Sequence, residues 1–288
     1  MASDEEGSEE ADQGLRRVGE KLIPVLLSTP VAVLILCLLW IVVSIGGEGI
    51  QALNWSLLTS SVLEGGIFES IVGTLYMLGG AVALATPLGV ATAVYLVEYA
   101  AESRLNHLII QAVNNLAGVP SIIFGLFGYA FFCRFLGLGV SLLSGWLTLV
   151  CMILPIIVSG SVEAISMVPT SFREAALALG APKWRVVKDV VLPAAAPGLA
   201  TSVILGVGRV AGETAAILFT SSVYLMRGLP STVLEPVMTL TYHLFVLLVA
   251  TPGGMTGKPF AMALLLLGLV VSLNVLAYII RVYYRRRW

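Results

Sequence analysis

Residues 22–46 read LIPVLLSTPVAVLILCLLWIVVSIG, a run of 25 residues without a charged side chain. A helix that rises 1.5 Å per residue crosses a hydrocarbon core of ~30 Å with about 20 residues. The run lacks a short apolar core ending in a small-residue cleavage site, so it predicts a retained membrane anchor and not a signal peptide. Charged positions delimit further stretches of this kind along the chain. The six predicted spans are 22–46, 67–96, 108–133, 145–164, 197–224 and 259–281.

The composition agrees with a membrane protein. Of 288 residues, 58% are hydrophobic and 11% are charged, and the mean hydropathy is +0.97. A soluble domain has roughly a quarter charged residues, so too few charges are present here to cover a soluble globule. The net charge of -1 gives no indication of a nucleic-acid partner. Cys37, Cys133 and Cys151 lie singly in apolar runs, which predicts packing residues and neither a disulfide framework, a zinc site nor a redox pair.

A seventh apolar segment, 238–250 (MTLTYHLFVLLVA), is too short to span easily. With six spans, the two termini, loop 97–107 and loop 165–196 share one side and hold 12 of the 16 lysines and arginines. The positive-inside rule therefore predicts that both termini are cytoplasmic. We expect 238–250 to be an amphipathic helix at the outer interface, partly tucked between spans.

No segment alternates polar and apolar residues over the length that a membrane barrel requires, so the predicted fold is all-α. Residues 1–14 (MASDEEGSEEADQG) are strongly acidic and lack aromatic and β-branched side chains, which predicts a disordered tail. Pro87, Pro120 and Pro155 interrupt the predicted spans. Such breaks suit a translocation pathway, where freed carbonyls face a polar cavity, and they suit ordinary helix kinks equally well.

The fifth predicted span carries charges deep in an apolar run. Arg209 lies 12 residues beyond Pro197, near mid-membrane, and Glu213 follows four residues later on the same face of a continuous helix. A buried arginine costs about 2.5–3.5 kcal/mol on insertion scales, so it needs a partner or a polar cavity. Two interpretations compete: the pair neutralises itself as a brace, or the guanidinium binds an oxyanion in transit, helped by the Thr214 hydroxyl.

The loop 165–196 is the longest predicted cytoplasmic connection. Thr170-Ser171 predicts the N-cap of a short helix, which Gly180 ends. Pro182 predicts the start of a second helix, 182–191, that leads into the fifth span. A compact helix pair presented to the cytoplasm is typical of a docking surface.

This loop resembles the coupling loop of ABC-importer permeases. Glu174-Ala175-Ala176, Gly180, Val190 and Leu192-Pro193 match the E-A-A-x3-G-x9-I-x-L-P signature with Val190 as the only departure. The resemblance implies a type I ABC-importer permease bundle whose loop docks on a cytoplasmic ATPase. It assigns the coupling role to Phe172, Arg173, Glu174, Ala175, Ala176, Gly180, Pro182 and Lys183.

Three further segments resemble the phosphate-uptake (PstA-type) permeases. They are 115–126 (NLAGVPSIIFGL), 71–99 and 209–214 (RVAGET), and the similarity extends from about residue 67 to the C-terminus. The resemblance implies that Arg209, Glu213 and Thr214 lie on the phosphate path. It implies a permease domain at 67–288, which follows an acidic cytoplasmic tail (1–20) and a first span with its outer loop (21–66), both predicted from charge and hydropathy. That domain includes the coupling loop 165–196 and the outer loop 225–258.

The implied assembly places this chain in a prokaryotic plasma membrane, in contact with lipid. Its expected partners are a PstC-type permease, two PstB-type ATPases, an external PstS-type phosphate-binding protein and phosphate itself. The chain has no Walker A glycine loop, so we expect no cofactor, and we expect ATP hydrolysis in a partner subunit. Another oxyanion, molybdate or sulfate, and a non-transporting scaffold remain alternatives. An intramembrane enzyme would need paired aspartates, a Ser-His or Ser-Lys pair or a metal cluster in the spans, which the sequence does not offer.

Overall fold

A computed structural model describes residues 2–100, 104–250 and 257–285 of the chain. These residues form helices and one isolated β-bridge, between Ser222 and Val237, which confirms the all-α prediction. The principal helices are α1 (Ala2–Ala52), α3 (Phe68–Val94), α4 (Arg104–Ala117), α5 (Ser121–Gly128), α6 (Leu142–Ser166), α7 (Thr170–Ala178), α9 (Leu192–Ala211), α11 (Leu240–Ala250) and α12 (Lys258–Arg285). Short helices are α2 (Trp55–Thr59), the 3-10 turn η1 (Val62–Glu64), α8 (Lys183–Arg185) and α10 (Ala215–Leu218), and π-helical segments are η2 (Tyr95–Tyr99), η3 (Tyr129–Phe135) and η4 (Val186–Val191).

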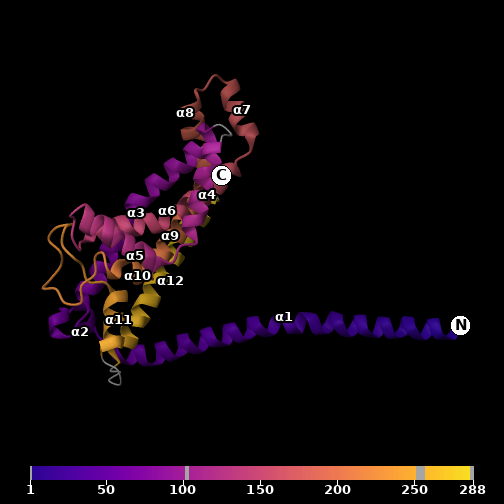
Figure 1. Cartoon of the computed structure of the whole chain (residues 1–288), viewed down its shortest axis with the longest axis horizontal. Helices are drawn as coiled ribbons and strands as arrows, with labels where there is room; N and C mark the ends of the chain where they lie inside the picture. The colour runs from indigo at the N-terminus through magenta and orange to yellow at the C-terminus, as the bar shows by residue number, and fades with distance from the viewer. Residues whose placement is uncertain (1, 101–103, 251–256, 286–288) are drawn as a thin grey trace.

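The core of the bundle is α6, which packs between α3 and α9 (Figure 1). Its side chains Met152, Ile153 and Ile157 are almost completely buried. Small residues permit the close approach of neighbouring helices. A Cβ on Gly80 of α3 would overlap the Trp146 ring of α6, so this crossing requires glycine.

Within the described residues, five helices are long and apolar enough to cross a membrane, and a sixth span results if one bent pair is counted. The five are Leu26–Ala52, Phe68–Tyr99, Leu142–Ser166, Lys183–Ala211 and Lys258–Leu276. The bent pair corresponds to the third span predicted from the sequence.

The sequence predicts the third span, 108–133, as one stretch, but in the structure it is not one straight helix. Its two halves, Asn106–Ala117 and Ser121–Phe135, meet at an angle of 104°. Pro120 disfavours helical geometry at Val119 and lacks the N–H that a continuing helix would use. The apolar run therefore continues through a sharp corner.

The fifth predicted span, 197–224, is also different. Helix α9 ends at Ala211, and the chain then passes through Gly212 and the short helix α10. At its N-terminal end α9 extends back through η4 and α8 to Lys183. The second loop helix and the fifth span are thus continuous, and Pro193, which lacks an N–H, lies just after the π-helical segment η4.

Segment 238–250 contains α11, and its predicted position, partly tucked between spans, is confirmed. The prediction of an amphipathic helix is wrong, because Thr241 and His243 are buried while Phe245, Leu248 and Val249 are exposed. Helix α11 packs against α3 and α12, and Leu240 and His243 are each 1% exposed. Its polar side chains find partners inside the protein: His243 Nδ1 lies 2.8 Å from Ser70 Oγ, and Thr241 Oγ1 donates to the Glu213 carbonyl. The tucked position is possible because these groups are satisfied internally.

The N-terminal part of helix α1 points away from the bundle, and the C-terminal end of α1 contacts α12 (Figure 1). A Cβ on Gly49 would lie 2.8 Å from the Phe260 carbonyl, which shows how closely the two helices approach there. The helix begins at Ala2, so residues 2–14 of the predicted disordered tail are helical in the structure. An established helix propagates cheaply into residues such as Glu and Ala, and acidic residues are favourable at a helix N-terminus.

Candidate coupling surface and substrate path

Helix α7, which carries the E-A-A signature, projects at one tip of the bundle together with α8 (Figure 1). Its N-cap is Pro169, with Thr170 as the first helical residue, so the predicted Thr170-Ser171 cap is wrong. The backbone N–H of Phe172 donates to the Pro169 carbonyl at 3.2 Å. Pro169 supplies an extended ψ of 138° immediately before the helix, a geometry that starts it without a side-chain cap.

Gly180 ends α7, as the sequence predicts. It adopts a φ of +81°, which a residue with a Cβ reaches only at a cost. Its N–H donates to the Leu177 carbonyl at 2.9 Å, and the Ala181 N–H donates to the Ala176 carbonyl at 3.2 Å. These two bonds form a Schellman motif, which turns the chain back toward the membrane.

The outer face of this loop is apolar and uncovered. None of the α7 side chains is buried; Phe172 is 52% exposed and Leu179, directly after the helix, 89%. Leu177 and Trp184 are also exposed, and Glu174 and Ala175 lie among them. Exposed apolar side chains gathered on one tip of a bundle are typical of a protein-binding surface.

Two residues of the predicted coupling set point the other way. Ala176 packs against a buried cluster that includes Ile165, Val168 and Val186. Arg173 turns its guanidinium into the bundle, where its side chain is only 17% exposed. Both side chains are therefore turned away from the exposed face of α7.

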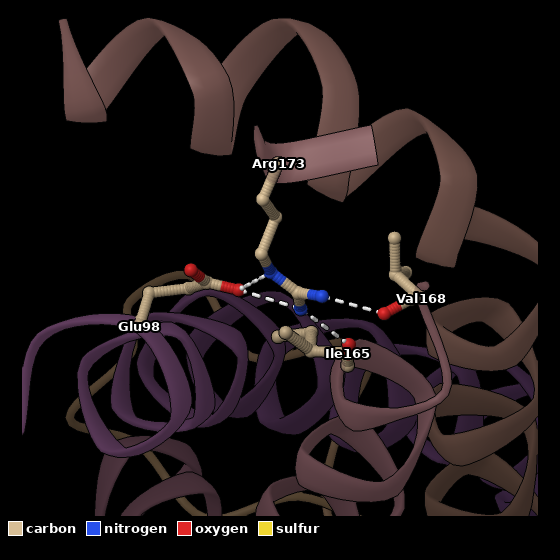
Figure 2. A network of polar contacts seen from close by, with 4 residues as sticks. All are labelled: Glu98, Ile165, Val168 and Arg173. Carbon is tan, nitrogen blue, oxygen red and sulfur yellow. Dashed lines mark hydrogen bonds and ion pairs between the residues drawn. The ribbon is translucent and has the colours of Figure 1, made fainter. Parts of the chain in front are cut away.

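The guanidinium of Arg173 joins three elements, as Figure 2 shows. Its Nε donates to Glu98 Oε1 at 2.9 Å, and Nη2 lies 2.8 Å from the same oxygen. Nη1 donates to the Val168 carbonyl at 2.5 Å and Nη2 to the Ile165 carbonyl at 2.9 Å. Glu98 belongs to η2 at the end of α3, the Ile165 carbonyl lies in the last turn of α6, and the Val168 carbonyl lies just after that helix.

Cations surround the second half of the loop. Lys183 Nζ lies 5.2 Å from the centre of the Tyr99 ring, and Arg185 and Lys188 flank the ring of Trp184. These contacts are exposed, so each contributes about 0.5–1 kcal/mol. Pro182, the N-cap of α8, starts this half as predicted.

Arg209 lies in the last turn of α9, and its side chain is exposed. A cation in this position is favourable, because the last carbonyls of a helix have no intrahelical donors. Leu205, one turn earlier on the same face, is 60% exposed. On the α12 side, Asn274 Oδ1 lies 3.7 Å from the place of a Cβ on Gly208, so α12 approaches α9 closely there.

Glu213 does not lie on the helix face that carries Arg209, because α9 ends before it. In the described part of the chain, no ion pair joins the two residues, so the self-neutralised brace is not formed. Glu213 Oε1 instead accepts a hydrogen bond from the Ala216 N–H at 3.1 Å, which caps α10. Thr214 is the N-cap residue of α10, without a side-chain cap bond.

The sequence analysis did not identify Glu98 as a functional residue. Glu98 is 7% exposed, and it lies 75 residues from Arg173 along the chain. The available signal was a lone carboxylate at the cytoplasmic end of an apolar span. Such an acid needs a cation once it is buried, but its partner is not evident from spacing.

The family of binding-protein-dependent transport system inner membrane components matches residues 85–288. The chain belongs to this family. The phosphate transport system permease protein PstA 1 of Mycobacterium tuberculosis (strain CDC 1551 / Oshkosh) is 39% identical over 186 residues, covering 63% of this chain and 61% of its own length. This chain thus spans about three fifths of that relative. The phosphate transport system permease protein PstA of Yersinia pestis is 32% identical over 252 residues, covering 84% of this chain and 83% of its own.

Solved structures give the same fold. A bacterial alginate ABC transporter chain, solved in complex with an alginate pentasaccharide-bound periplasmic protein, superposes with a TM-score of 0.63 at 14% identity. The match covers 93% of each chain. An inward-facing MetNI methionine ABC transporter gives a TM-score of 0.59 at 18% identity, covering 76% of this chain and 97% of the other. The type I ABC-importer permease fold expected from the sequence is thereby confirmed.

Proposed function

We propose that this chain is the transmembrane permease subunit of an ATP-driven importer of inorganic phosphate. The observation that carries the proposal is α7: a capped helix with the coupling signature, no buried side chain, and an apolar outer face at one tip of a membrane bundle. Such a helix needs a protein partner. The relatives named as phosphate transport permeases support phosphate as the substrate.

The ATPase partner binds the outer face of the coupling loop. Phe172, Glu174, Ala175, Gly180 and Lys183 are exposed there and supply the contact. The chain itself hydrolyses nothing, and two PstB-type subunits provide the energy. Closure of these subunits pushes the loop and shifts the bundle between two rigid arrangements.

Phosphate passes Arg209. The exposed guanidinium offers planar paired donors to a tetrahedral oxyanion. Thr214 follows beyond the end of α9 and supplies a hydroxyl to the same path. A PstC-type permease forms the other half of the path, and a PstS-type protein delivers phosphate to the outer face.

Both termini are cytoplasmic in this proposal, and residues 225–258 face outward. The basic loop and the positive-inside rule support this orientation. In this proposal the chain consists of a cytoplasmic tail (1–20), a first span with its outer loop (21–66) and a permease domain (67–288).

The decisive experiment is copurification of the chain from its native membrane with a count of the accompanying subunits. The proposal requires a second permease, two ATPases and a phosphate-binding protein. Vesicles containing this complex should take up labelled phosphate when ATP is present on the ATPase side, and excess molybdate or sulfate should not compete. Competition by either anion at equal concentration would favour the alternative oxyanion importer.

A further inference from the structure

Arg173 connects elements that the chain itself does not connect directly. Helices α6 and α7 are joined by a short turn, and α7 continues through α8 and η4 into α9. Helix α3, in contrast, is 75 residues away from α7, measured from Glu98 to Arg173. Glu98 gives α3 its hydrogen-bonded link to the coupling helix.

The link is buried and its hydrogen bonds are well formed. The Glu98 and Arg173 side chains are 7% and 17% exposed, so water screens their interaction little. One carboxylate oxygen receives two N–H groups, and the remaining donors reach carbonyls at the end of α6 (Figure 2). A cation at this helix end is favourable, and a planar fork suits the geometry better than an ammonium group would.

Among the described residues, no second ion pair joins α3 or η2 to α7. Ala176, the other inward-facing residue of α7, contributes only a methyl group to the apolar cluster around Val168. Lys183 reaches Tyr99 of η2 through an exposed cation–π contact, but it belongs to α8 and not to α7. Loss of the Glu98 carboxylate would therefore remove the ion pair between η2 and α7 and leave α3 connected to α7 through the apolar cluster and through its packing on α6.

We propose that the Glu98–Arg173 ion pair is the latch that transmits displacement of α7 to α3, with both side chains acting as positioning residues for coupling. This inference rests on the proposed docking of α7 to an ATPase. Movement of α7 then displaces α3 and α6 together as one body. Without the latch, ATP hydrolysis continues while the bundle follows it incompletely.

The test uses the complete complex in vesicles, with phosphate uptake and ATP hydrolysis measured in the same sample. Glu98→Gln keeps the size and one acceptor but removes the charge. We expect the phosphate transported per ATP hydrolysed to fall by about tenfold, within the usual range of coupling between two sites. The ATPase subunits should still copurify, because the outer face of α7 is untouched.

The control is Glu163→Gln, which removes an exposed carboxylate of α6 that forms no ion pair in the described ranges. This variant should transport as much phosphate per ATP hydrolysed as the wild type. A cycle of Glu98→Gln, Arg173→Gln and the double variant separates a shared latch from two independent structural roles. The latch predicts a double variant no worse than the more impaired single variant, and Arg173→Lys, which keeps the charge, should fall between wild type and Arg173→Gln.

A wild-type ratio in Glu98→Gln, or losses that add in the double variant, would overturn the latch. Glu174→Lys, measured in parallel, distinguishes this failure from a failure of the docking proposal. If Glu174→Lys uncouples and Glu98→Gln does not, the latch alone is wrong. If neither uncouples, α7 does not dock on the ATPase at all.

Discussion

Arg209 presents a planar guanidinium at the end of α9, exposed and without an ion pair to Glu213 in the described structure. If it binds phosphate in transit, Arg209→Lys keeps the charge but loses the paired donors. We expect uptake to fall by about tenfold to a hundredfold, since a hydrogen bond to a charged group contributes about 1.5–3 kcal/mol. Arg209→Gln should abolish uptake with the complex still assembled. Uptake of labelled phosphate into vesicles is the measurement, and wild-type uptake by Arg209→Gln would exclude this role.

Glu213 provides a matched single-residue comparison for Arg209. Its carboxylate caps α10 through the Ala216 N–H, and glutamine retains an acceptor for that bond. We therefore expect Glu213→Gln to assemble normally and to lose less uptake than Arg209→Gln. Equal losses in the two variants would indicate that the carboxylate also contacts the passing anion.

The coupling loop makes a prediction at the scale of one element. Leu179 is 89% exposed directly after α7, and an apolar side chain buried by a partner contributes about 1.5–3 kcal/mol. Leu179→Asp should weaken binding of the ATPase by about tenfold to a hundredfold. Trp55→Asp, at a residue that is 78% exposed on α2 and distant from the loop, should leave the copurified ATPase unchanged. Normal copurification with Leu179→Asp would remove this face from the docking surface.

The end of α7 supplies a second prediction. Gly180 has a φ of +81°, so Gly180→Ala should cost about 1–2 kcal/mol of local stability. Gly79→Ala is the control, because Gly79 is in a helix with open space around it. A protease titration of the loop in intact complexes would detect the difference. Equal cleavage of both variants would mean that the turn is held by other contacts.

The sequence predicted the elements that depend on interactions between residues close together along the chain. Charge spacing located most of the spans, and Gly180 marked the end of α7. Charge spacing gives the extent of a stretch and not the path of its backbone, so it did not locate the corner at Gly118–Pro120 or the end of α9 at Ala211. The inward turn of Arg173 depends on Glu98, a contact that only the folded bundle brings together.

At the scale of the whole molecule, the account places the coupling loop and residues 225–258 on opposite sides of the membrane. After replacement of the native cysteines, of which Cys37 is exposed, Thr232→Cys should react with an impermeant thiol reagent added outside intact cells. Lys183→Cys should react only after the membrane is opened. Both positions are exposed in the structure, so a difference in labelling reports sidedness and not burial. Labelling of Lys183→Cys from outside would reverse the proposed orientation.

The most direct test of the account is phosphate uptake by the purified complex in sealed vesicles, with ATP supplied on the ATPase side. We predict accumulation of labelled phosphate that requires ATP hydrolysis, and that persists in excess molybdate or sulfate. Glu174→Lys should stop accumulation while hydrolysis continues. An assembled complex that hydrolyses ATP but accumulates no phosphate, or that accumulates another oxyanion in preference, would contradict the proposed function.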